Sequence, residues 1–205
     1  AEIQGYLPEY VRLNRMYRDI PASEILAWSK LANLRQVTEF AMKARGIARH
    51  DISAREIRAK WNNPKTAQFD EYFYESSGWH EWFFQMIDPS DRTIFGLLRL
   101  RVPSQIFSWE KHFIEELECA AIIREVHVFG DQLKVGEKWG VWEEGWWGQH
   151  MGFGKLLLEK AYEKIQTYYP QCKKIAVIAG VWSRPYYEKR GYNLQNEYMI
   201  RTIDR

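Results

Sequence analysis

Residues 149–158 read QHMGFGKLLL, in which two glycines stand one residue apart and an apolar run follows at once. The apolar residues that continue to residue 169 recur with the 3.6-residue period of an amphipathic helix. The loop therefore opens a helix, whose first amide groups lack helical partners and whose dipole favours an anion. Glycines let a phosphate approach such a backbone closely, so the stretch predicts a phosphate site. A tight turn that needs glycines only for its backbone angles is the alternative interpretation.

Alternating strand-like and helix-like segments surround this loop. Two apolar runs flank the turn residues DPSD at 88–91 and predict an antiparallel hairpin. The order of elements is hairpin, strand, glycine loop, helix, strand, helix and strand, which predicts a mixed α/β fold. A tryptophan-rich insertion at 131–148 separates the third strand from the loop. The expected strands are 80–87, 93–102, 120–130, 173–180 and 193–203, and the expected helices are 155–169 and 183–192.

The first sixty residues differ from the rest in carrying an excess of basic over acidic side chains. Residues 22–46 are predicted to form one helix, capped by Ser23 and ended by Gly46. The sequence NNPK at 62–65 interrupts the pattern. We therefore expect a helical segment over 1–60 and a separate domain over 61–205.

The composition limits the classes of protein to consider. A hydrophobic content of 46% suffices for a sizeable core, and a net charge of +2 does not by itself require a nucleic-acid partner. Two cysteines, Cys119 and Cys172, exclude a disulfide framework or a four-cysteine metal site within this chain and favour a reduced, cytoplasmic setting. No apolar run approaches the ~20 residues of a membrane helix, and the N-terminus does not read as a signal peptide. No metal site and no membrane partner are expected.

Residues 149–154 also fit the pattern [Arg/Gln]-x-x-Gly-x-[Gly/Ala], which resembles the coenzyme A diphosphate loop of GNAT acetyltransferases. The strand REVHVF before it and Tyr187, four residues before Gly191, match the order of that family. This resemblance implies a GNAT acyltransferase fold, with a mixed, mostly antiparallel sheet flanked by helices and an N-terminal helical linker. It also implies acetyl-CoA as the substrate.

A narrower resemblance is to the catalytic subunit of Elongator, which modifies the wobble uridine of tRNA. The matching segments are 7–21, 48–58, 124–130, 149–161, 173–192 and 198–200. Three features depart from that family: its radical-SAM core is absent, Arg49 is followed by His50-Asp51-Ile52-Ser53 where many members carry a cysteine, and Trp182 replaces a usual glycine.

The resemblance implies that the chain is the linker and acetyltransferase part of a tRNA uridine-34 C5-modifying enzyme. It should bind acetyl-CoA and hydrolyse it when tRNA binds, but not complete the modification. S-adenosylmethionine and a 4Fe–4S cluster are expected only in the missing radical-SAM domain. The expected partners are tRNA, that domain, and Elongator-like subunits or a second copy. Alternatives are a free-standing N-acetyltransferase of proteins or small amines, and a non-catalytic RNA- or partner-binding module.

The resemblance also implies roles for individual residues. Tyr187 is expected to protonate the departing thiolate, with Tyr186, Glu125 and His127 as further catalytic candidates. The tryptophans of the insertion, Trp139, Trp142, Trp146 and Trp147, are expected to cover the cleft or dock on the absent domain. Acetyl-CoA should contact Glu125, Val126, His127, Val128, Gln149, His150, Met151, Gly152, Phe153, Gly154, Lys155 and Tyr187. RNA phosphates should contact Arg12, Arg15, Arg18, Lys43, Arg45, Arg49, Arg55 and Arg58.

Overall fold

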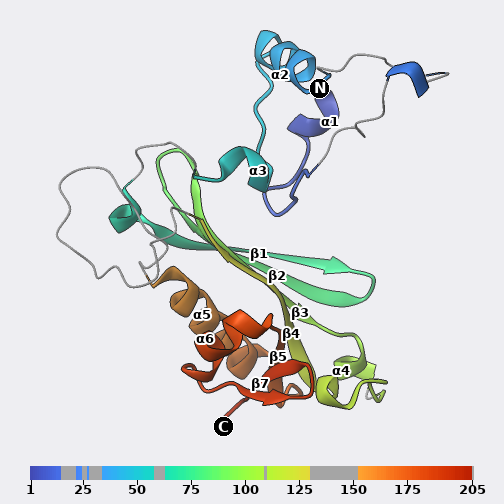
Figure 1. Ribbon diagram of the computed structural model, residues 1–205, viewed down its shortest axis with the longest axis vertical. Helices are drawn as coiled ribbons and strands as arrows, with labels where there is room; N and C mark the ends of the chain where they lie inside the picture. The colour runs from blue at the N-terminus through green and yellow to red at the C-terminus, as the bar shows by residue number, and fades with distance from the viewer. Residues whose placement is uncertain are drawn as a thin grey trace. The chain divides into compact units, whose positions relative to one another are not determined.

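The computed structural model describes residues 1–14, 22–24, 27, 34–57, 63–108, 110–129 and 152–204. These residues divide into two compact units, Ala1–Glu56 and Ile57–Arg205. Figure 1 shows short helices in the first and a long twisted sheet with helices in the second. None of the described helices is long and apolar enough to cross a membrane.

The described residues of the first unit form three α-helices and one 3-10 turn. The predicted single helix over 22–46 is wrong at its beginning, where Ala22–Glu24 form the 3-10 turn η1, and right at its end. Gly46 has φ +66° and its amide donates to Lys43 O, while the Ile47 amide donates to Met42 O, which is a Schellman ending. The α-helices are α1 (Glu2–Gly5), α2 (Leu34–Ala44) and α3 (Ile52–Arg55).

Buried arginine contacts hold the first unit together. Arg55 is 5% exposed, donates to the backbone oxygens of Glu9 (2.8 Å) and His50 (2.9 Å), and pairs with the Glu9 carboxylate at 3.2 Å. Arg49 donates twice to the buried carboxylate of Asp51, at 2.8 and 2.9 Å. These fork-shaped contacts connect segments that lie up to 46 positions apart in sequence.

The second unit is built on a seven-stranded sheet in the order β1-β2-β3-β4-β5-β7-β6. Only β4 and β5 run parallel, and all other neighbours are antiparallel. The predicted mixed α/β fold is confirmed. The strands are β1 (Gln68–Ser76), β2 (Trp79–Ile87), β3 (Ile94–Val102), β4 (Ala120–Val128), β5 (Lys174–Ile178), β6 (Asn193–Gln195) and β7 (Tyr198–Thr202).

The helices of this unit follow the predicted pattern closely. The main helix is α5 (Phe153–Tyr168), and its buried residues Leu157, Leu158, Ala161 and Ile165 form one apolar stripe over the central strands. Phe84, Leu98 and Leu100 lie opposite that stripe in the same core. The shorter elements are η2 (Pro64–Thr66), α4 (Gln105–Ser108), η3 (Glu115–Leu117), η4 (Val181–Ser183) and α6 (Arg184–Glu188).

Two strand predictions are incomplete. Strand β1 was not expected, yet it pairs with β2 along its whole length through a two-residue turn at Ser77 and Gly78, both with positive φ. Such turns match the twist of antiparallel strands. The single strand expected over 193–203 is instead the β6–β7 hairpin, because the chain reverses at Asn196, whose φ is +51°. Asparagine tolerates this left-handed conformation better than most residues.

Candidate functional site

The glycine loop meets α5 at a left-handed residue. Gly152 is the N-cap, with φ +78°, and its carbonyl oxygen accepts from the Leu156 amide at 3.0 Å. The amides of Phe153, Gly154 and Lys155 therefore begin the helix, where an α-helix has no partners for them. Gly152 is needed for its backbone angle. Apart from its chain neighbours, no atom of the described residues lies within 4 Å of the position that its Cβ would take. Gly152 is therefore not crowded by the described residues at this end of α5.

Gly154 is needed for a different reason. A Cβ there would meet Tyr186 Oη at 2.5 Å and Val128 Cγ2 at 3.5 Å. The absence of a side chain thus lets the end of β4, the start of α5 and the side chain of Tyr186 converge. The sequence predicted Tyr186 as a catalytic candidate and gave no sign of this contact, because it joins residues that lie far apart along the chain.

The parallel strands β4 and β5 separate next to this contact between Gly154, Val128 and Tyr186. The pairing of β4 with β5 ends at Ile123↔Val177, although β4 continues for five more residues to Val128. A register shift in the β3–β4 pairing falls at the same place, between Arg99 and Leu100. Bulges of this kind bend a strand and end its pairing. Residues 124–128 of β4 therefore run along the opening next to the start of α5.

Tyr187 occupies the core side of α6. It is 8% exposed and belongs to the main core, with its ring 5.6 Å from that of Tyr192 and 5.4 Å from that of Tyr186. Burial raises the pKa of Tyr187 to about 12, the neighbouring Tyr186 adds to the rise, and Arg190 opposes it. Tyr187 is consequently a neutral hydrogen-bond donor rather than a base near neutral pH.

Tyr186 is less buried, and burial raises its pKa while Arg190 opposes the rise. The Arg190 guanidinium carbon lies 3.4 Å from the ring centroid, a cation–π contact. This stacked arginine fixes the ring whose hydroxyl reaches Gly154. Trp182, one turn earlier, is 97% exposed.

Glu125 and His127 lie on β4 as predicted, and their described partners differ. Glu125 Oε2 accepts from Arg99 Nε at 3.0 Å across the strand pair. His127 is exposed, with its ring 4.3 Å from that of Phe129. The carboxylate of Glu125 is thus engaged by an arginine across the strand pair.

Several predicted residues lie outside the described part of the chain. They are Gln149, His150 and Met151 of the loop, the four tryptophans Trp139, Trp142, Trp146 and Trp147, and Arg15, Arg18 and Arg58 of the predicted RNA contacts.

Most of the remaining basic residues predicted to contact RNA are engaged with carboxylates. Arg12 pairs with Glu56 at 3.2 Å, and Arg49 and Arg55 make the buried contacts described above. Arg45 pairs with Glu2 at 3.1 Å but keeps 58% of its side chain exposed, and Lys43 is exposed at the end of α2. Lys43 and Arg45 are therefore the described members best placed to meet a phosphate. Within the described ranges, no group of three or more His, Cys, Asp or Glu side chains could hold a metal ion.

Comparison with known proteins gives a consistent result. No family model matches the chain. It is 34% identical over 208 residues to "Elongator complex protein 3" of Bos taurus and 35% identical over 208 residues to that of Homo sapiens. These alignments cover 100% and 99% of this chain but 36% of each relative, so the chain spans about a third of their length. The structure of "The archaeal Methanocaldococcus infernus Elp3 with N-terminus deletion (1-46)" matches 97% of this chain and 46% of that one, with a TM-score of 0.79 and 30% identity.

Proposed function

Because this chain is homologous to the C-terminal region of Elongator complex protein 3 and has its GNAT-type acyltransferase fold, we propose that its second unit binds acetyl-CoA and catalyses transfer of the acetyl group. The observation that carries this proposal is the convergence of three elements. The end of β4 at Val128, the start of α5 at Gly154 and the hydroxyl of Tyr186 meet where β4 has parted from β5.

The opening between β4 and β5 suits an extended polar arm followed by a diphosphate. Backbone groups of Glu125, Val126, His127 and Val128 hold the pantetheine arm, since a strand edge offers regularly spaced donors and acceptors. The first-turn amides of Phe153, Gly154 and Lys155 receive the diphosphate, which the helix dipole favours. Gln149, His150 and Met151 complete the loop.

Tyr187 supplies the proton in this proposal. In hydrolysis, water attacks the thioester carbonyl carbon, the carbon–sulfur bond breaks, and the leaving thiolate takes the proton from Tyr187 Oη. The water loses a proton to solvent, and Tyr187 regains its own from solvent. A thiolate in a dry cleft is costly without a donor, and burial keeps the Tyr187 hydroxyl protonated, with a pKa of about 12. Tyr186, whose hydroxyl lies beside Gly154 at the start of α5, contacts the diphosphate end of acetyl-CoA instead.

The full activity extends beyond this chain. We infer that residues 1–60 are a linker that follows a radical-SAM domain, and that the whole enzyme modifies C5 of uridine 34 in cytoplasmic tRNA. The names of the relatives and their greater length support this inference. With two cysteines in 205 residues, the three thiolates of a radical-SAM cluster would have to come from that domain, together with S-adenosylmethionine. Elongator-like subunits or a second copy are the expected protein partners.

The decisive experiment compares Gly152→Asp with Gly152→Asn by titration calorimetry with acetyl-CoA. Both side chains tolerate the left-handed conformation of residue 152, and both fit because that position is open. Only aspartate brings a negative charge to the diphosphate site. We expect Gly152→Asn to keep measurable binding and Gly152→Asp to lose it. If both variants fold and bind acetyl-CoA with equal affinity, the diphosphate does not bind at this loop.

The tRNA part of the proposal has a separate test. Lys43→Gln and Arg45→Gln together should weaken tRNA binding and reduce its salt dependence, since each lost phosphate contact lowers the slope of log K against log salt by roughly one. Glu75→Gln, on an exposed side chain of the second unit, serves as the control for a change of charge. An unchanged salt slope would show that these residues do not contact RNA. In a separate assay, transfer of the acetyl group to amines would favour an N-acetyltransferase.

A further inference from the structure

Three apolar side chains are exposed to solvent where β5 leads into α6. Ile178 is 69% exposed, Val181 66% and Trp182 97%. Ile178 ends β5, and the other two belong to η4, the turn from which α6 continues. An almost fully exposed tryptophan is unusual, because this side chain normally buries most of its large apolar surface. Exposed apolar side chains that gather in one place indicate a binding site.

The backbone that carries Trp182 is fixed by its own hydrogen bonds. The amide and the hydroxyl of Ser183 each donate to the Gly180 carbonyl oxygen at 2.8 Å. Pro185 follows in the first turn of α6, where its ring sets the backbone angle φ. The exposed indole is therefore presented from a rigid turn. Such a turn loses little conformational entropy when a flat ligand stacks on the indole.

Three cations without a carboxylate partner follow the exposed tryptophan. They are Arg184, Lys189 and Arg190, and within the described part of the chain none of them forms an ion pair. The guanidinium of Arg190 stacks on an aromatic ring, which does not neutralise its charge. Glu188 is the one acidic residue from 181 to 190. Because α6 has five residues and is about 8 Å long, these cations can meet neighbouring phosphates of one strand.

Aromatic and basic side chains together fit a single-stranded nucleic acid. Unpaired bases stack on exposed aromatic rings, while cations beside the rings contact the phosphates. A protein partner fits less well, because lysine is depleted from protein interfaces. That the nucleic acid is RNA follows from the proposed binding of tRNA, on which this inference rests. We propose that Trp182 is a platform on which an unpaired base of RNA stacks, with Arg184 and Lys189 at the adjoining phosphates.

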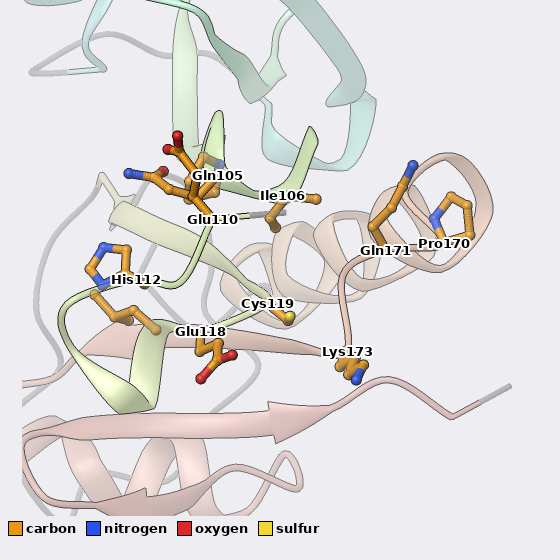
Figure 2. Close-up of a pocket in the computed structure, with 11 residues that line it drawn as sticks. Gln105, Ile106, Glu110, His112, Glu118, Cys119, Pro170, Gln171 and Lys173 are labelled. Carbon is orange, nitrogen blue, oxygen red and sulfur yellow. The ribbon is translucent and has the colours of Figure 1, made fainter. Parts of the chain in front are cut away.

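Phe113 provides a matched control, since it is an equally exposed aromatic ring in acidic surroundings. It is 91% exposed and stacks on His112, with the ring centroids 4.8 Å apart. His112 lines a cavity together with Glu110 and Glu118, as Figure 2 shows, and these carboxylates outnumber the one lysine of the wall. Carboxylates repel phosphates. An RNA that stacks on Trp182 should therefore not use Phe113.

Two probes separate the base from the phosphates. One is oligouridylate of about ten nucleotides, within the site size of single-strand binders, and the other is an abasic oligomer with the same number of phosphates. Trp182→Leu should weaken the binding of oligouridylate about 5- to 150-fold, the range for one lost stack, and leave that of the abasic oligomer unchanged. Phe113→Leu should change neither. The melting temperature of Trp182→Leu should stay the same, because the ring is 97% exposed.

The phosphate contacts have their own readout. Arg184→Gln with Lys189→Gln should lower the salt dependence of binding for both probes, by roughly 0.7 in the slope of log K against log salt for each lost contact. A photochemical cross-link locates the base. Oligouridylate that carries one 5-iodouridine should join to Trp182 under long-wavelength ultraviolet light, with loss of hydrogen iodide, and mass spectrometry of the digested protein identifies the residue.

Several outcomes would overturn the proposal. These are an unchanged affinity of Trp182→Leu for oligouridylate, a cross-link at Phe113, and a loss of affinity for acetyl-CoA in place of RNA, which would assign the ring to the adenine of the coenzyme. The proposed tRNA binding fails separately. Full tRNA binding by Trp182→Leu contradicts the platform alone, whereas no tRNA binding by the unchanged protein contradicts both.

Discussion

The hydroxyl oxygen of Tyr186 lies 2.5 Å from the point that a Cβ atom on residue 154 would occupy. No real Cβ tolerates such a contact with a fixed neighbour, and the Tyr186 ring is held by Arg190, whose guanidinium carbon stacks 3.4 Å from its centroid. The second glycine of the loop is therefore a steric requirement, whereas the first, Gly152, is a conformational one with φ +78°.

This contact predicts that Gly154→Ala destabilises the protein and that Tyr186→Phe corrects the defect. The added methyl group overpacks the start of α5 and should lower the free energy of unfolding by about 1–3 kcal/mol. Removing the hydroxyl leaves the ring carbon beneath it 3.5 Å from the same point, an ordinary contact. Urea denaturation of the two single variants and the double variant measures this coupling. Additive losses in the double variant would contradict the steric account.

Tyr187→Phe should slow acetyl-CoA hydrolysis by ~100-fold or more while the affinity for acetyl-CoA hardly changes, because general acid assistance contributes 10²–10⁴-fold. Tyr186→Phe should do the opposite and weaken affinity more than turnover, since its hydroxyl lies at the start of α5. Single-turnover hydrolysis and calorimetry distinguish the two, with and without tRNA. Normal turnover in Tyr187→Phe would leave the site without its proposed acid.

Alkaline pH should destabilise the protein partly through Tyr187. Burial raises its pKa from 10.0 to about 12, so the folded state keeps a proton that the unfolded state loses between these values. This contribution to stability is full below about pH 10 and is lost as the pH rises towards 12, for a total of roughly 3 kcal/mol. Denaturation curves from about pH 9 to about pH 12 should show that the free energy of unfolding falls less for Tyr187→Phe than for the unchanged protein. Tyr168→Phe is the control, since Tyr168 is 64% exposed.

Glu81 offers a test of a buried charge in the sheet. Its carboxylate is 1% exposed and pairs with Arg101 and, at 3.1 Å, with Arg124, whose side chains are 24% and 44% exposed. Arg101→Met should lower the free energy of unfolding by about 3–5 kcal/mol, because it removes a partner from a buried charge. Arg124→Met should lower it by less, since Arg124 is the more exposed partner. Adding Glu81→Leu to Arg101→Met should recover part of the loss, and chemical denaturation that shows no recovery would contradict this account.

The sequence alone predicted the helices and strands that depend on residues close together along the chain. Helical periodicity over 155–169, the apolar runs of β2 to β5 and the DPSD turn each indicated the element that formed. Side chains that alternate along a strand or repeat along a helix carry this signal by themselves. The same signal failed for β1, whose partly exposed residues alternate weakly, and for 193–203, where one asparagine reverses the chain.

The contacts within the sites depended on tertiary structure. Gly154 precedes Tyr186 by more than thirty residues, and only the packing of α6 against the start of α5 brings them together. The same holds for the opening after Ile123↔Val177. The family resemblance implied an RNA surface at the basic residues near the N-terminus, yet Arg12, Arg49 and Arg55 pair with carboxylates in the fold. Composition gives the number of charged side chains, but the tertiary structure determines which of them pair with a neighbour and which stay accessible to a partner.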